Sequence, residues 1–207
     1  MELDPRTTAV ISIHCQGDII GPDGAFAQMF HEQVLTRDVV GRIRDLQGAA
    51  REAGSLVVYT RIACAEDYAD LEANSPLLQA VVQAGCLKEG GAQTEIIDAV
   101  APQEGDVVIT NQRVGGWTPE LVAALEERGI DTLLLCGVAT NISVENTARA
   151  ASDAGYRVVL VEDACSAATA EAHRSTVESL GLLAEITTVP EARQALGSSE
   201  RMAGTGR

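Results

Sequence analysis

Lysine, positive charge and long apolar runs are all scarce in this sequence of 207 residues. Only Lys88 is a lysine among the 15 basic residues, so a mechanism that needs an ammonium group has a single candidate. No apolar run reaches about 18 residues, which excludes an ordinary transmembrane helix. The 15 basic residues stand against 30 acidic ones, and the net charge of −15 argues against nucleic-acid and anionic-membrane partners.

Cysteine and histidine occur without the spacing of a metal site. The five cysteines include no CxxC pair, and the three histidines, His14, His31 and His173, lie far apart in the sequence. We therefore expect no metal, no cofactor and five free thiols. The first residues are acidic, unlike a signal peptide, which predicts a cytoplasmic protein. His31 and His173 are expected on the surface of helices.

Apolar runs rich in β-branched residues alternate with longer helical stretches. Continuously apolar strands separated by helices predict a three-layer α/β/α sandwich with a doubly wound, mostly parallel six-stranded sheet. One domain is expected over 1–197, followed by a disordered tail over 198–207. The predicted strands are 8–13, 56–61, 107–110, 132–136, 157–161 and 184–188. The predicted helices are 32–53, 92–100, 118–129 with an N-cap threonine, 141–154, 166–180 and 191–196.

Polar residues of catalytic type follow three of these strands. In a doubly wound sheet the ligand lies outside the carboxyl ends of the strands. His14 follows the first strand, Asn111 follows the third, and Ser143 lies in the first turn of the helix after the fourth. The free N–H groups and the dipole of that turn favour an oxyanion. We therefore expect His14, Asn111 and Ser143 to converge on one edge of the sheet, in a site for a small molecule.

The segment around Ser143 carries a long signature. It reads GVATNISVENTAR over 137–149 and resembles the signature of the isochorismatase-like superfamily, which includes cysteine hydrolases and nicotinamidases. Gln16 and Asp18 in the first loop match as well, and so does VEDAC over 161–165. The resemblance spans about 8–188. It implies the fold of this superfamily, a hydrolase activity and a homo-oligomer.

The resemblance places the superfamily's catalytic Asp, Lys and Cys at His14, Asn111 and Ser143, so all three are replaced. The histidines of the nicotinamidase metal site, which follow the second strand in that group, are absent here. Neither the thiolate mechanism nor nicotinamidase activity therefore carries over.

The resemblance also implies features of the pocket. A cis peptide between Val138 and Ala139 is expected to aim the N–H groups of Ala139 and Ser143 into one oxyanion hole. Trp117 stands where the superfamily has an aromatic residue that lines the substrate pocket, and the larger Trp is expected to narrow it.

Three hypotheses about function stay open. A serine hydroxyl needs an adjacent base with a pKa near the working pH, and histidine suits that role better than aspartate. The first hypothesis is a hydrolase of a small amide-like or related molecule that uses Ser143 with His14 and Asn111. The second is non-covalent acid–base chemistry by His14, as in a lyase, an isomerase or vinyl-ether hydrolysis. The third is a catalytically inactive protein that binds a ligand.

Neighbouring residues have both a ligand-binding and a structural interpretation. Gln16 and Asp18 are candidates for ligand contact, although hydrogen bonds that organise the first loop are the commoner use of such side chains. Arg113 suits a substrate carboxylate or an ion pair with one of the 30 acidic residues. Cys15 lies beside His14, and strand alternation turns it toward the core.

Overall fold

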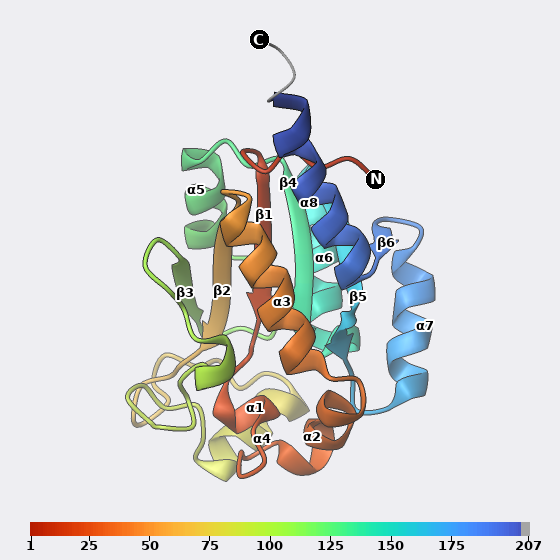
Figure 1. Cartoon of the computed structure of the whole chain (residues 1–207). Coiled ribbons are helices and arrows are strands. Elements are labelled where there is room, and N and C mark those ends of the chain that lie inside the picture. Colours follow the sequence, from red (N-terminus) through yellow and green to blue (C-terminus); the bar gives the residue numbers. More distant parts are fainter. Residues whose placement is uncertain (204–207) are drawn as a thin grey trace.

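The architecture rests on one six-stranded sheet (Figure 1). The computed structural model describes the backbone of residues 1–203 and the side chains of residues 1–197. The strands lie in the order β3-β2-β1-β4-β5-β6, and every neighbouring pair is parallel, so the predicted doubly wound sheet is confirmed. They are β1 (Thr8–Ile13), β2 (Leu56–Ile62), β3 (Val107–Asn111), β4 (Thr132–Val138), β5 (Arg157–Ser166) and β6 (Glu185–Thr187).

The strands are added to the sheet in two directions, and the point where the direction switches lies between β1 and β4. From β1 the chain winds through β2 to β3, whereas β4, β5 and β6 continue on the other side of β1. In an open parallel sheet such a switch leaves a crevice beyond the carboxyl ends of the two central strands, where ligands bind. The residues that follow β1 and β4 therefore face the place where a site is expected.

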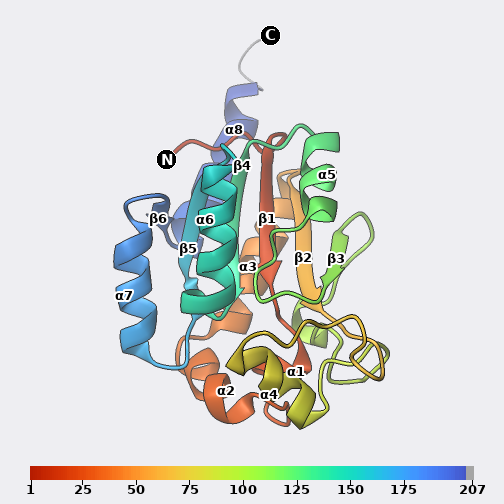
Figure 2. The ribbon, with the colours of Figure 1, turned by 180° about the vertical axis from the view of Figure 1, so that it is seen from behind.

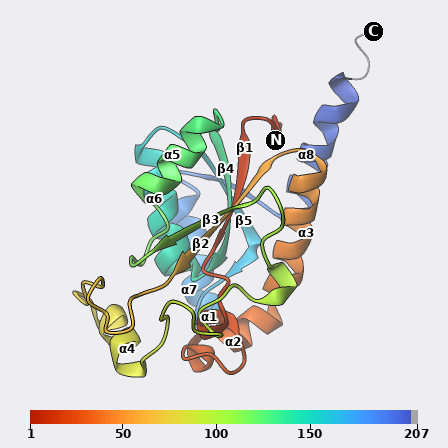
Figure 3. The same cartoon turned by 90° about the vertical axis from the view of Figure 1, so that its left-hand side faces the viewer.

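Helices cover both faces of the sheet, which confirms the three layers (Figures 2 and 3). Because both faces are covered, all six residues of β1 are buried. One face is covered by α3 (Val39–Glu52) and α8 (Val189–Ala203), and the other by α5 (Pro119–Glu127), α6 (Glu145–Asp153) and α7 (Ala170–Leu180). Beyond the carboxyl ends of the strands lie α1 (Gly17–Ile20), α2 (Ala27–Thr36) and α4 (Pro76–Ala84).

Side-chain caps begin three of the helices. The hydroxyls of Ser75, Thr118 and Thr169 accept hydrogen bonds from the backbone N–H three residues further on, at 3.3, 3.3 and 3.1 Å. A proline follows Ser75 and Thr118, at the position where its missing N–H is not needed. The predicted start of α5 is confirmed, and the same pair of signals begins α4, a helix that was not predicted from the sequence.

The helix predicted over 32–53 is in fact two helices. Asp38 separates α2 from α3, and its φ of 50° lies in the left-handed region, which ends the regular helix. The break allows the chain to leave the carboxyl edge of the sheet, where α2 lies, and to pack α3 along one face (Figure 1).

The helix predicted over 92–100 is reduced to a 3₁₀ turn, η1 (Asp98–Val100). The backbone before it pairs with the loop after β1 instead of with itself. The N–H groups of Gly17 and Asp18 donate to the carbonyls of Glu95 and Gln93, at 3.1 and 2.6 Å. This pairing ties a segment distant in sequence to the edge of the sheet that carries His14.

The end of the chain is helical for longer than predicted. Helix α8 contains the predicted helix 191–196 and continues to Ala203. The predicted disorder of 198–207 stays a prediction, because the side chains of 198–203 and the whole of 204–207 lie outside the described residues. Across the part of the chain that is described, no helix has the length and apolar character needed to cross a membrane.

Candidate active site

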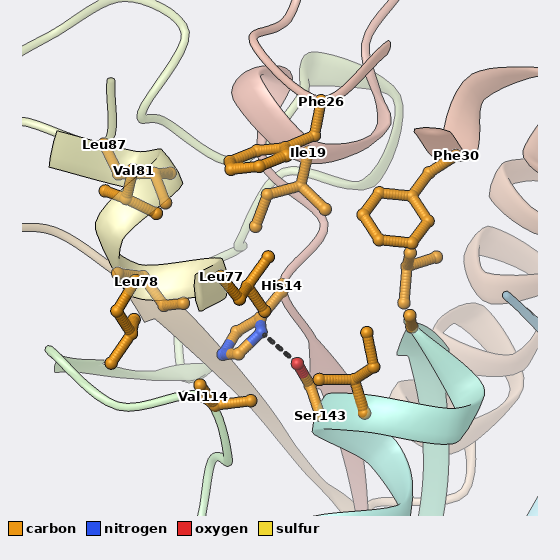
Figure 4. A pocket seen from close by; sticks show the side chains of 14 residues that line it. His14, Ile19, Phe26, Phe30, Leu77, Leu78, Val81, Leu87, Val114 and Ser143 are labelled. Carbon is orange, nitrogen blue, oxygen red and sulfur yellow. Dashed lines mark hydrogen bonds between the residues drawn. The ribbon is translucent and has the colours of Figure 1, made fainter. Parts of the chain in front are cut away.

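His14 and Ser143 face each other across the switch between β1 and β4 (Figure 4). His14 is the first residue after β1, and Ser143 lies in a π-helical turn, η2 (Thr140–Val144), that leads from β4 into α6. The imidazole Nδ1 lies 3.1 Å from the Ser143 Oγ. Both side chains are buried, with 1% of His14 and 6% of Ser143 exposed. The structure therefore brings two of the three predicted catalytic residues into hydrogen-bond contact.

The backbone at His14 turns sharply as the chain leaves β1. Its φ of 54° is left-handed, a conformation that costs a residue with a Cβ roughly 1–2 kcal/mol. Its N–H donates to the carbonyl of Thr60 in β2 at 3.0 Å, which holds the turn in place. Strained residues of this kind gather at functional sites, where the surrounding structure keeps them in position.

Burial sets the protonation of His14. The pKa of the imidazole falls from 6.5 to about 4, because the charged form loses its hydration. The ring is therefore neutral at pH 7, with one N–H donor and one acceptor nitrogen. Either Ser143 donates to Nδ1 and Nε2 carries the hydrogen, or Nδ1 donates to Ser143 and Nε2 is an acceptor. In both tautomers the buried Nε2 lacks a hydrogen-bond partner among the described residues.

The turn that carries Ser143 is tied to α6 and to the loop after β3. The peptide bond between Val138 and Ala139 is cis, as the resemblance implied. The Thr147 hydroxyl in α6 donates to the Ser143 carbonyl at 2.8 Å and accepts from the N–H of Gly116 at 2.9 Å. Thr147 thereby links the turn to the loop after β3.

A small apolar cavity adjoins the two side chains (Figure 4). Its volume is about 40 Å³. His14 and Ser143 supply the polar side chains in its lining, and the other lining residues are apolar. They are Ile19, Phe26, Phe30, Ile62, Leu77, Leu78, Val81, Leu87, Val114, Val138, Ala139 and Ile142. A ligand that reaches Ser143 is therefore surrounded mainly by hydrocarbon.

Comparison with known proteins places this site in a family. Residues 8–191 match the isochorismatase domain. The chain belongs to the isochorismatase family. It is 35% identical over 198 residues to the isochorismatase family protein YecD of Escherichia coli O157:H7, a match that covers 95% of this chain and 100% of that protein.

Solved structures of the isochorismatase family and its neighbours share this fold. The cysteine hydrolase from Pseudomonas syringae pv. phaseolicola 1448A matches with a TM-score of 0.85 and 27% identity over 96% of each chain. N-carbamoylsarcosine amidase from Thermoplasma acidophilum matches with a TM-score of 0.72 and 24% identity, over 88% of this chain and 96% of that one. The second likeness is one of fold.

In this isochorismatase-family protein the third predicted catalytic residue, Asn111, is hydrogen-bonded to a neighbouring backbone group and not to His14 or Ser143. The Asn111 Oδ1 accepts from the N–H of Arg113 at 2.7 Å, and Asn111 is not among the residues that line the cavity. Its buried Nδ2 has no partner within the described part of the chain, and the same holds for the Thr60 Oγ1. Unsatisfied polar atoms thus lie at or near the carboxyl ends of three neighbouring strands, β1, β2 and β3.

Gln16 and Asp18 both bind backbone groups. Gln16 is fully buried, donates to the carbonyls of Ile62 and Thr94 and accepts from the Ile62 N–H, at 2.6–2.7 Å. One Asp18 carboxylate oxygen accepts from the N–H of Leu87 at 2.9 Å. These contacts fit the structural interpretation of both residues, since they fasten the loop after β1 to more distant segments.

Trp117 and Arg113 are not among the residues that line the cavity, whereas Ala139 is. The Trp117 ring packs edge-on against Tyr156, with 5.3 Å between the ring centroids. Arg113 is exposed and pairs with Glu72 at 3.2 Å. Cys15 is buried in the core, and burial raises the pKa of its thiol well above the usual value.

The expectation that His173 lies on the surface is wrong. It is 4% exposed, and its Nδ1 lies 2.8 Å from the Thr140 hydroxyl while its Nε2 lies 3.2 Å from Glu162. Arg37 donates to the same Glu162 carboxylate at 2.8 Å. The signal for burial was present in the sequence, because His173, Thr176 and Leu180 recur at helical spacing on the inward face of α7.

No group of three or more metal-binding side chains occurs in the described residues. That the protein uses no metal and no cofactor stays a prediction from its cysteine and histidine spacing.

Proposed function

We propose that this protein hydrolyses a small amide-like (C–N) or related acyl compound, with Ser143 as the nucleophile and His14 as its base. The observation that carries the proposal is the 3.1 Å contact between the Ser143 Oγ and the His14 Nδ1 inside a cavity at the switch point of the sheet. Membership of a hydrolase family supports it, as does the name of one structural neighbour, an amidase.

The chemistry follows from the tautomer in which Ser143 donates to Nδ1. The Ser143 oxygen attacks the substrate carbonyl carbon while its proton passes to the His14 Nδ1. The oxyanion then faces the start of the η2 turn, where the family resemblance assigns the N–H groups of Ala139 and Ser143. The protonated His14 returns the proton to the leaving nitrogen, and the C–N bond breaks to give an acyl-serine. Water attacks this ester while one of its protons passes to His14. The bond between the acyl carbon and the Ser143 Oγ then breaks, His14 returns the proton to the Ser143 oxygen, and the carboxylic acid leaves.

The dyad lacks the acidic partner of a complete triad. No carboxylate of the described residues binds His14, and Asn111 is hydrogen-bonded elsewhere. In serine proteases, loss of the carboxylate that orients the histidine lowers kcat by about 10⁴-fold. A base whose pKa is about 4 is also weaker than one matched to neutral pH. We therefore expect slow turnover, best detected with activated esters.

The missing partner also favours a second candidate function, the binding of a small molecule without turnover. The same cavity and the same unsatisfied Nε2 would then hold a ligand that is released unchanged.

The test separates these functions by trapping the acyl intermediate. Purified protein is incubated with the p-nitrophenyl ester of a short aliphatic acid, and p-nitrophenol release and intact mass are followed. We expect one acyl group on Ser143, and neither adduct nor turnover in Ser143→Ala. Ser175→Ala, an exposed serine on α7, is the matched control and should behave as the unmodified protein does.

The other outcomes are equally definite. Turnover that survives in Ser143→Ala but is lost in His14→Ala would replace the proposal with non-covalent acid–base catalysis. No turnover in any variant, together with ligand binding, would leave the binding function.

A further inference from the structure

The cavity next to His14 is apolar on almost every side, which restricts what it is able to hold. We infer that it takes the acyl part of an uncharged short-chain aliphatic amide or ester and discriminates against carboxylates. This inference deepens the proposed function and rests on it for the reacting carbonyl group; the preference for an uncharged aliphatic group rests on the cavity alone.

The size of the cavity sets the first limit. Its volume is about 40 Å³, whereas pockets for drug-sized ligands measure roughly 300–1,000 Å³. A chain of a few carbon atoms suits such a space. Its walls come from the ends of β2 and β4, from the η2 turn, and from α1, α2 and α4 with nearby loops. Phe26, Phe30, Leu77 and Leu78 are among the side chains that would touch the chain (Figure 4). Each CH₂ group buried there should raise the binding constant about fourfold.

Charge sets the second limit. None of the lining side chains is a lysine, an arginine or a carboxylate. Three cations on neighbouring segments are already paired: Arg61 of β2 with Glu89 and Glu95, Lys88 with Glu66, and Arg113 with Glu72. A carboxylate that entered the cavity would lose its hydration without gaining a counter-ion, which is strongly unfavourable. His14 does not replace the missing cation, because burial keeps the imidazole neutral at pH 7.

The unsatisfied His14 Nε2 indicates which polar group a ligand needs. The His14 Nε2 is buried without a partner among the described residues, and in Figure 4 it lies on the side of the ring away from Ser143, toward Val114. In the tautomer that makes His14 a base for Ser143, Nε2 carries a hydrogen. A neutral oxygen acceptor next to the aliphatic chain would satisfy it, as the carbonyl oxygen of a bound amide or ester does.

The test measures binding in Ser143→Ala, which has no nucleophile and so keeps its ligands intact. Isobutyramide and isobutyrate have nearly the same shape and differ in charge. At pH 7.5 we expect isobutyramide to bind about tenfold more tightly or better, measured by calorimetry or by chemical shifts of the protein. In the series acetamide, propionamide and isobutyramide, affinity should rise with each carbon. Equal or tighter binding of isobutyrate, or no rise along the series, would overturn the inference.

A pair of variants on one helix locates the ligand. Leu78 lines the cavity from α4, whereas Val82 on the same helix is exposed. Leu78→Ala should shift the preference toward bulkier amides such as cyclohexanecarboxamide, and Val82→Ala should leave the preference unchanged. Identical preferences in the two variants would show that the amide binds elsewhere and would overturn the inference.

Turnover by the unmodified protein separates this inference from the proposed function. Selective binding of the neutral amide without acyl-serine formation would retain the ligand class and refute hydrolysis. Hydrolysis confined to carboxylate-bearing substrates would retain the hydrolase and refute the ligand class.

Discussion

The two buried histidines hold the same turn from opposite ends, and they differ in what their second nitrogen meets. His173 contacts Thr140, the first residue of the η2 turn, and His14 contacts Ser143, its fourth. The other nitrogen of His173 contacts Glu162, which Arg37 also binds. The other nitrogen of His14 lacks a partner among residues 1–197.

The difference separates a structural histidine from one that is open to a ligand. Buried polar atoms are nearly always hydrogen-bonded, so an unsatisfied one needs an explanation, such as a bound molecule. Burial and the nearby Arg37 lower the pKa of His173, an effect that Glu162 opposes, whereas desolvation alone lowers the pKa of His14. His173 is thus part of a satisfied network, and His14 keeps one polar atom for a ligand.

The largest effect is expected when the His14 imidazole is removed. Asparagine tolerates the left-handed backbone at this position, so His14→Asn should fold normally. We expect kcat/KM for an activated ester to fall by about 10²–10⁴-fold, the usual contribution of a general base. The measurement is ester hydrolysis at pH 7.5, with circular dichroism as the control for folding. A fall of less than tenfold in a folded variant would remove His14 from the mechanism.

The pH dependence of stability tests the burial of His14. Its pKa is about 4 in the folded protein against 6.5 when exposed, so between these values the unfolded chain binds the proton more readily. Above about pH 6.5, His14 is neutral in both states and does not lower the free energy of unfolding. Below that pH the free energy of unfolding decreases, by about 3 kcal/mol near pH 4. Urea unfolding of the unmodified protein and of His14→Asn should show this difference in their pH profiles. Parallel profiles would mean that the imidazole is hydrated in the folded state.

The meeting of His14 and Ser143 could be predicted because it depends on topology. In a doubly wound sheet with the strand order 3-2-1-4-5-6, which is one of the two common orders, the ends of β1 and β4 are neighbours. The residues that follow them then face one crevice, whatever the details of packing.

The walls of the cavity could not be predicted in the same way. Phe30 and Leu78 belong to α2 and α4, which reach the edge of the sheet through contacts between segments distant in sequence. The direction of the Asn111 side chain is set by the backbone N–H of Arg113, a local detail of a loop. The surface prediction for His173 failed because it weighed residue type over the helical spacing of the inward face of α7.

The network around His173 should matter for stability more than for chemistry. His173→Leu fills the buried position with an apolar side chain. The Thr140 hydroxyl then loses its hydrogen bond to the imidazole, and Glu162 loses one of its hydrogen-bond partners. Unsatisfied buried groups cost about 1–3 kcal/mol, so the free energy of unfolding should fall by that amount. Chemical denaturation measures it, with Arg174→Leu on the exposed side of α7 as the matched control. A larger loss of kcat in His173→Leu than in His14→Asn would reverse the roles given to the two histidines.

The smallest effect is expected for Arg113, a charged residue that does not line the cavity. Arg113 has 63% of its side chain exposed and pairs with Glu72, which has 75% exposed, so solvent screens the ion pair. Arg113→Ala should change the free energy of unfolding by no more than about 0.5 kcal/mol and leave ester hydrolysis unchanged. Isobutyrate binding is the informative measurement, because an arginine that held a substrate carboxylate would make this variant lose affinity for the anion. Suppose that Arg113→Ala weakened isobutyrate binding several-fold while Glu72→Ala strengthened it. Arg113 would then supply the counter-ion that the apolar cavity lacks, and the protein would accept carboxylate-bearing substrates.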